Sequence, residues 1–172
     1  MKLSIQKADL QRGLARIQAI VERRNSMPIL ANVLLDARKD GEGSLLIAAT
    51  DLEVGIRSSL DAKVAKAGAL TVSARKLYDI VRELPDEPVA LAATANSYLE
   101  IQCGRARFSL AGASAEEYPS LPEFPSDKLV RLPAAVLSVM IERTMYAASV
   151  DETRYNLNGA FIEVDANAGK LR

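Results

Sequence analysis

Apolar residues recur at helical spacing near the start of the chain. The pattern predicts a helix over residues 9–24, whose apolar side is formed by Leu10, Leu14, Ile17 and Val21. A short extended run from Leu3 precedes this helix. Asn25, Ser26 and Pro28 interrupt the periodicity, and residues 29–36 return as an extended apolar run. Residues 3–36 therefore predict a strand, a helix, a loop and a second strand.

Two further strands are predicted between residues 44 and 58. The polar stretch 39–43 is typical of a hairpin turn, and a strand should follow over 44–49. Residues 50–58 then alternate between apolar and polar side chains. The alternation predicts a strand with Leu52, Val54 and Ile56 on one face and Asp51, Glu53 and Arg57 on the other.

The opening plan then restarts at an offset of 67 residues, which places Ile5 on Val72 (72 − 5 = 67). After a short strand over 70–72, Ser73 is expected to cap a helix over 74–84. The apolar stripe of that helix is Leu77, Ile80, Val81 and Leu84. Strands over 89–93, 98–103 and 105–111 should follow. The pattern predicts an α+β domain made of two copies of one plan.

A third copy of the plan begins beyond a proline-rich stretch. Three prolines between 118 and 125 predict an extended linker and a domain boundary. The expected organisation is a complete domain over 1–117, a linker over 118–128 and the start of a second, truncated domain over 129–172. There, at an offset of 127, we expect a strand over 130–132, a helix from Pro133 and a strand over 157–163. So short a piece should be poorly ordered by itself.

Composition excludes several classes of chemistry. The 22 basic and 22 acidic residues cancel, so a wholly basic nucleic-acid binder is excluded, but a segregated basic surface is not. The chain has no histidine, which removes Ser-His-Asp catalysis and the usual zinc ligand sets. The single cysteine, Cys103, cannot form an internal disulfide, and no apolar run has the length of a membrane span. We expect a cytoplasmic protein with no cofactor, metal or membrane partner.

Two pairs of carboxylates leave open an alternative class of protein, a small enzyme. Asp51 and Glu53 would lie on one strand face, and Asp151 is followed by Glu152. Either pair could carry acid-base or metal chemistry in a small α+β enzyme, although two carboxylates without a third ligand are more often a solvated surface. A monomeric interaction module is a third interpretation.

Basic residues are repeated on the predicted helices. Arg12 and Arg16 are four residues apart on a side of the first helix different from the apolar one, and Arg23 and Arg24 end it. Arg75, Lys76 and Arg82 occur on the second helix. One such helix is usually only a solvated face. Repetition on helices that face one partner favours binding of an anion.

Five segments, in order along the chain, carry a family resemblance. They are PILANVLLD, AATDLEVGIR, VSARKLYDIVRELP, GRARFSLAGASAEEYPSLP and DETRYNLNGAFIEVD. Together they resemble the beta subunits of bacterial DNA polymerase III, the sliding clamps, over residues 1–163. The resemblance implies the DNA-clamp fold, a pseudo-symmetric domain with two helices packed on antiparallel sheets. It also implies a non-enzymatic processivity factor with three domains per chain, of which this sequence holds the first and the opening of the second.

In this family two chains close head to tail into a ring around duplex DNA, and the helices face the hole. The resemblance implies a sequence-independent contact with phosphates. The positions it assigns to DNA contact are Arg24, Arg75, Tyr155, Asn156 and Asp151, although an acid at Asp151 departs from some relatives. Arg12, Arg16, Arg82 and Arg143 are further basic candidates for this contact.

The resemblance implies two more surfaces. The joint between the two chains would use Ile80, Leu84 and Phe108 at its centre and Lys76, Arg105 and Arg107 at its rim. Leu157 falls at a position lining the pocket that receives peptides of partner proteins. Those partners would be the alpha subunit of DNA polymerase III, the clamp loader and repair polymerases.

Overall fold

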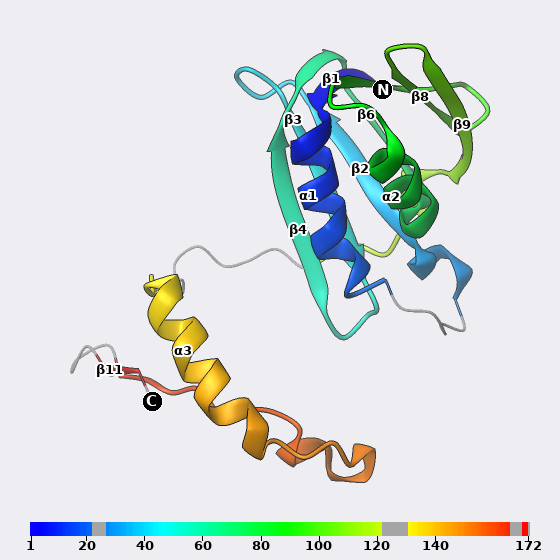
Figure 1. Ribbon diagram of the computed structural model, residues 1–172. Coiled ribbons are helices and arrows are strands. Elements are labelled where there is room, and N and C mark those ends of the chain that lie inside the picture. Colours follow the sequence, from blue (N-terminus) through cyan, green and yellow to red (C-terminus); the bar gives the residue numbers. More distant parts are fainter. Residues whose placement is uncertain (22–26, 122–130, 166–169, 172) are drawn as a thin grey trace. The chain divides into compact units, whose positions relative to one another are not determined.

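The computed structural model describes residues 1–21, 27–121, 131–165 and 170–171 (Figure 1). The chain forms two compact units, Met1–Pro122 and Glu123–Arg172, which are described separately. No helix in the described ranges is both long and apolar enough to cross a membrane.

The described residues of the first unit form two α-helices and nine strands. In chain order they are β1 (Lys2–Gln6), α1 (Lys7–Gln18), β2 (Asn32–Arg38), β3 (Ser44–Thr50), β4 (Gly55–Asp61), β5 (Lys63–Lys66), β6 (Gly68–Ser73), α2 (Ala74–Glu83), β7 (Pro88–Ala93), β8 (Tyr98–Cys103) and β9 (Ala106–Ala113). Short 3-10 turns, η1 (Pro28–Ala31) and η2 (Ala115–Glu117), precede β2 and follow β9.

All nine strands belong to one antiparallel sheet with the order β4-β3-β2-β6-β9-β8-β7-β1-β5. The two strands at its ends, β4 and β5, follow each other in the chain and are separated only by Ala62. The sheet therefore curves round so that its last strands are joined covalently. Both helices lie side by side against it (Figure 1).

Strand pairing reveals the internal symmetry directly. β1, the first strand of copy one, pairs with β7 of copy two, and β6, the first strand of copy two, pairs with β2 of copy one. In these ladders Ile5 lies opposite Val89, and Val72 lies opposite Val33. The two copies thus exchange equivalent neighbours, as a two-fold relation requires. The α+β class with two helices packed on antiparallel strands is confirmed.

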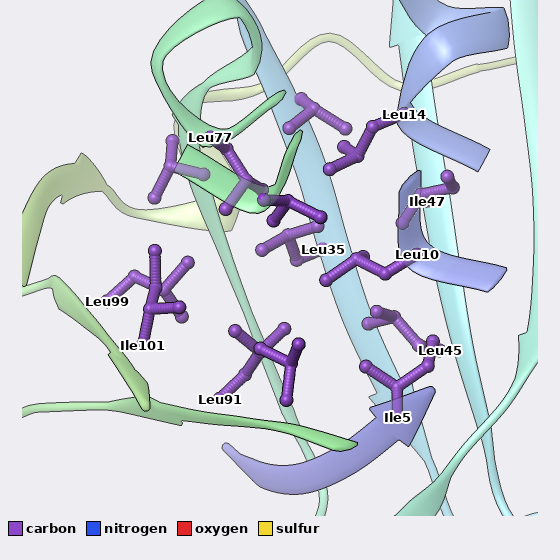
Figure 2. Packing of buried hydrophobic residues seen from close by; sticks show 14 of the residues in the cluster. Ile5, Leu10, Leu14, Leu35, Leu45, Ile47, Leu77, Leu91, Leu99 and Ile101 are labelled. Atoms are coloured by element: carbon purple, nitrogen blue, oxygen red, sulfur yellow. The ribbon is translucent and has the colours of Figure 1, made fainter. Parts of the chain in front are cut away.

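The core lies between the helix pair and the sheet. Figure 2 shows side chains from both sources pointing into one interior, with Leu10 and Leu14 from α1 and Leu77 from α2 meeting residues of β1, β2, β3, β7 and β8. Leu10, Leu14 and Leu77 have no exposed surface. Burial of such a side chain contributes about 1.5–3 kcal/mol. The predicted apolar stripes therefore became the inner faces of the two helices.

The helix predicted over 9–24 is shorter than expected. α1 begins at Lys7 and ends at Gln18, and Val21 packs against the core from beyond the helix end. The basic residues Arg23 and Arg24 fall outside the described ranges. In contrast, α2 begins as predicted, because the Ser73 hydroxyl accepts a hydrogen bond from the Lys76 amide.

The strand predicted over 50–58 is wrong in its first half. β4 begins only at Gly55, because Leu52 adopts a left-handed φ of 82° and Asp51 forms a turn with the amides that follow it. Side chains of 51–54 therefore do not alternate across a sheet. β5, which no pattern predicted, adds a further strand beside β1.

The second unit keeps the predicted helix but not the predicted strands. α3 (Ala134–Thr144) begins after Pro133, as expected, and is followed by η4 (Met145–Ala147) and η5 (Glu152–Leu157). Residues 131–133 and 158–163 form no strand, and the described strands are β10 (Val164–Asp165) and β11 (Lys170–Leu171). α3 has no buried residue. A single strand has no neighbouring strand to form hydrogen bonds with its backbone groups. This is the physical reason why residues 131–133 and 158–163 do not form the predicted strands.

A buried tyrosine fixes the chain where it leaves the first unit. The Thr50 amide donates to the Tyr118 hydroxyl at 3.2 Å, and that hydroxyl donates to the Asn32 carbonyl at 3.2 Å. Since Leu34 pairs with Ala48, the same register places Asn32 opposite Thr50, two residues further along β2 and β3. The hydroxyl therefore bridges the open end of this ladder, and burial raises its pKa.

Replacing Tyr118 by Phe should destabilise the first unit by about 1–3 kcal/mol, because a buried amide and carbonyl lose their partner. Urea denaturation measures the change. The matched control is Tyr98→Phe, since Tyr98 is 45% exposed. Cleavage after Glu116 and Glu117 by a glutamate-specific protease should also accelerate. Equal stability of the two variants would contradict the bridging role.

Candidate nucleic-acid interface and sheet edge

The helix pair presents a basic outer face. Arg12 and Arg16 on α1 are exposed, as are Arg75, Lys76 and Arg82 on α2. Because α1 and α2 lie side by side and bury their apolar stripes in the same core, their outer faces form one surface of the unit (Figure 1). The structure thus leaves these five sequence-predicted basic residues exposed on the helix pair, with Arg12 and Arg16 bordering β4. Arg24 lies outside the described residues.

Most of the arginines on this face have a carboxylate close to the guanidinium group. The Arg12 guanidinium pairs with Asp9, Arg75 Nε lies 3.9 Å from the Asp79 carboxylate, and Arg82 Nε lies 3.0 Å from that of Glu83. The hydrogen bond from Arg82 to Glu83, with their mutual attraction, raises the pKa of Arg82. Such exposed pairs are weak, so the guanidinium groups can exchange partners.

Asp9 and Asp79 are the residues that sequence reasoning missed on this face. The signal was present: an acid and an arginine three or four residues apart on a helix are neighbours. Arg12 follows Asp9 by three residues, and Asp79 follows Arg75 by four. Counting basic residues alone overlooked how many of them carry a local counter-charge.

The candidates of the second unit lie on α3 and in the 3-10 segment. Arg143, in the last turn of α3, and Asn156 are exposed. Asp151 accepts hydrogen bonds from the amide and hydroxyl of Thr153, which lower the pKa of its carboxyl group. Tyr155 lies in η5, and its side chain falls outside the description.

The sheet edge at β9 carries an exposed aromatic residue. Residues 106–111 pair with β8 on one side, and only 112–113 pair with β6 on the other. Phe108 alternates onto the same face as Leu110, yet Phe108 is 44% exposed whereas Leu110 is 9% exposed. Arg105 and Arg107 are exposed beside it. Within the described chain, the second edge of 106–111 is thus left without a strand neighbour.

The remaining interface candidates belong to α2. Lys76 is exposed, Ile80 is half-buried against the core and Leu84, at the end of the helix, is 6% exposed. Leu157 of the second unit is 51% exposed and lines an open groove of about 690 Å³ together with Thr144, Ala147, Asn156 and Phe161, among others.

The Asp51/Glu53 pair does not form the strand-face site on which the alternative enzyme interpretation depends. The Asp51 carboxylate accepts hydrogen bonds from the Glu53 amide at 2.9 Å and the Val54 amide at 2.6 Å. It is therefore committed to a turn. Among the described residues, no cluster of three or more His, Cys, Asp or Glu residues has the arrangement of a metal site.

Comparison with known proteins decides the family. Residues 1–122 match the sequence model of the family described as DNA polymerase III beta subunit, N-terminal domain. The chain belongs to this family. The beta sliding clamp of Caulobacter vibrioides is 37% identical over 174 aligned residues, which cover 100% of this chain but 46% of that protein.

Solved structures agree in fold. A Caulobacter crescentus beta sliding clamp superposes with a TM-score of 0.84 at 38% identity, covering 99% of this chain and 45% of the other. The DNA polymerase III subunit beta of Pseudomonas aeruginosa gives a TM-score of 0.86 at 34% identity, covering 96% and 44%. The chain thus spans less than half the length of these relatives.

The turn at Asp51 gives a pH-dependent prediction. Hydrogen bonds from the Val54 and Glu53 amides lower the pKa of Asp51 below its ordinary value of 3.8, so the folded state prefers the ionised form. This stabilisation is present above the unfolded pKa and is lost as pH falls through the lower folded pKa. Asp51→Asn retains a neutral acceptor. Urea denaturation should show wild type more stable than Asp51→Asn at pH 7, with the gap closing towards pH 2. A gap that does not change with pH would contradict this account.

Proposed function

We propose that this chain is part of a DNA sliding clamp, a non-enzymatic processivity factor that encircles duplex DNA and tethers the replicative polymerase. Membership of the beta-subunit family and the names of its relatives support this function. The observation that carries it is the paired helices, which bury apolar stripes in one core and turn a row of arginines outward.

The outer face of α1 and α2 contacts the phosphates of the duplex. Arginines on exposed helix faces can approach phosphates without reaching base edges, so the contact is independent of sequence and weakens as salt rises. Arg12, Arg16, Arg75 and Arg82 supply this charge, together with Arg24. From the second unit, Arg143, Tyr155, Asn156 and Asp151 are the corresponding candidates.

The unpaired edge of β9 forms the joint with a second clamp subunit. An exposed phenylalanine beside an unpaired strand edge would be covered by a strand of the partner, which would also satisfy the backbone groups of residues 106–111. Ile80 and Leu84 extend the apolar centre, while Lys76, Arg105 and Arg107 lie at its rim. A head-to-tail joint between unlike surfaces closes two chains into a ring.

The domain organisation and the protein partners are part of the same proposal. Residues 1–117 form one clamp domain, 118–128 link it to the next, and 129–172 begin the second. Leu157 contributes to a pocket for peptides of the polymerase alpha subunit, the clamp loader and repair polymerases. The site of action is the cytoplasm, where the bacterial chromosome is copied.

Duplex binding by the 172-residue chain tests the DNA contact. Arg75→Gln combined with Arg82→Gln should lower affinity and reduce the salt slope by about 1.8 when measured by fluorescence anisotropy, since about 0.9 is lost per phosphate contact. The matched control, Arg38→Gln with Lys39→Gln, removes the same charge from the end of β2 and the turn after it. Equal losses in both variants would show that only net charge matters.

Sedimentation tests the proposed joint. If the partner strand that completes β9 belongs to a third domain, the 172-residue chain should sediment as a monomer. A stable ring-sized particle formed by this chain alone would contradict the assignment of the joint.

A further inference from the structure

The two exposed arginines of α1 differ in their surroundings. Arg12 forms an ion pair with Asp9, one turn earlier. Arg16, one turn later, has no hydrogen bond or ion pair with any residue of the described ranges. A phosphate can therefore meet the Arg16 guanidinium without displacing a carboxylate, whereas at Arg12 it must compete with Asp9.

Arg16 also borders a groove on the surface of the first unit. The groove has a volume of about 300 Å³ and lies between α1 and β4. Its lining includes Arg12, Arg16, Ser58 and Ser59, and also the acids Asp9 and Asp61. The serine hydroxyls are neutral donors, and Asp9 is already paired with Arg12. Asp61, which forms no ion pair with a described residue, is the acid that opposes a phosphate at the β4 side of the groove.

Gly13 sets the depth of this groove. A Cβ atom at this position would lie 2.7 Å from Cδ1 of Ile47 and 2.9 Å from Cδ1 of Leu60. The missing side chain lets α1 settle closely on β3 and β4, which places Arg12 and Arg16 at the groove beside the serines of β4. The groove is thus a consequence of helix packing in the core.

The arginines of α2 resemble Arg12 rather than Arg16. Arg75 has Asp79 within 3.9 Å, and Arg82 has Glu83 within 3.0 Å. Exposed ion pairs of this kind shift an equilibrium by up to about five-fold. That is enough to weaken a phosphate contact and too little to prevent it.

We propose that Arg16 is the principal phosphate contact of the α1–α2 surface, and that Asp9 and Asp79 act as internal competitors that weaken the contacts of Arg12 and Arg75. This inference rests on the proposed function and names the residues that tune it. When the duplex moves, an arginine that leaves a phosphate returns to its own carboxylate. The surface then holds DNA loosely enough to slide along it.

Duplex binding by the 172-residue chain at low salt separates these roles. Arg16→Gln should lower affinity by about 3–10-fold and the salt slope by about 0.9, as for a lost phosphate contact. The fold loss of affinity caused by Arg12→Gln should be less than half of that caused by Arg16→Gln. Arg38→Gln, which removes the same charge from the end of β2, is the matched control, and circular dichroism checks that each variant is folded.

Removal of a competing acid should have the opposite effect, which is a gain in affinity for the duplex. Asp79→Asn should raise affinity by about two- to five-fold, the strength of an exposed pair. Asp40→Asn, in the turn after β2, removes an equal charge and should change affinity less. In an Arg75→Gln background the gain from Asp79→Asn should fall to the level of the Asp40→Asn control, because the acid acts through that arginine.

The outcomes distinguish this inference from the proposed function. If Arg16→Gln costs no more than Arg12→Gln, or if the gain from Asp79→Asn persists without Arg75, the ranking of contacts is overturned while the DNA-binding face stands. If no substitution on α1 or α2 differs from its control on the turn beside β2, the DNA-binding face itself is overturned.

Discussion

Burial of two helix stripes in one shared core is the constraint on which this structure depends. Leu10, Leu14 and Leu77 have no exposed surface, so the rotation of α1 and α2 about their axes is set by the core (Figure 2). Once the inner stripes are fixed, the outer stripes of the two helices must share one surface. The basic surface thus follows from packing: each arginine is directed outward because a leucine on the same helix is directed inward.

The internal symmetry is incomplete, and its departures coincide with the proposed sites. In the first copy, α1 settles on β3 and β4 through Gly13, and the groove beside Arg16 results. In the second copy, the outer strand β9 carries the exposed Phe108, whereas the apolar residues Ile56 and Leu60 of the equivalent strand β4 are partly buried against the core. The outer edges of β4 and of residues 106–111 both lack a strand neighbour among the described residues, so the two copies differ here in side chains and not in pairing. Binding surfaces of different kinds therefore arise from two copies of one plan.

The charges show how a surface can attract DNA without holding it rigidly. Three arginines on the helix pair form ion pairs with carboxylates of their own helix, and Arg16 forms no ion pair with a described residue. Net charge hides this arrangement, because 22 basic and 22 acidic residues cancel. For a protein that must move along DNA, a mixture of one open contact and several competing ones is suited to rapid exchange between phosphates.

The sequence by itself determined the periodic features of this protein. Helical spacing located α2 and most of α1, alternation located β7 to β9, and the offset of 67 residues identified the repeat. These features depend on contacts between near neighbours or on patterns that recur along the chain. The motifs also identified the family.

Only the structure decided the turn at Asp51 and the contacts between distant residues. Residues 51–54 alternate as a strand would, although they form a turn. The alternation does not reveal that the Asp51 carboxylate accepts hydrogen bonds from the Glu53 and Val54 amides, or that Leu52 adopts a left-handed φ. The bridge from Tyr118 to Thr50 and Asn32 spans 68 and 86 residues. The groove beside Arg16 required the approach of α1 to β4. The bridge and the groove join segments that are far apart in the sequence, and no local pattern of side chains encodes such contacts.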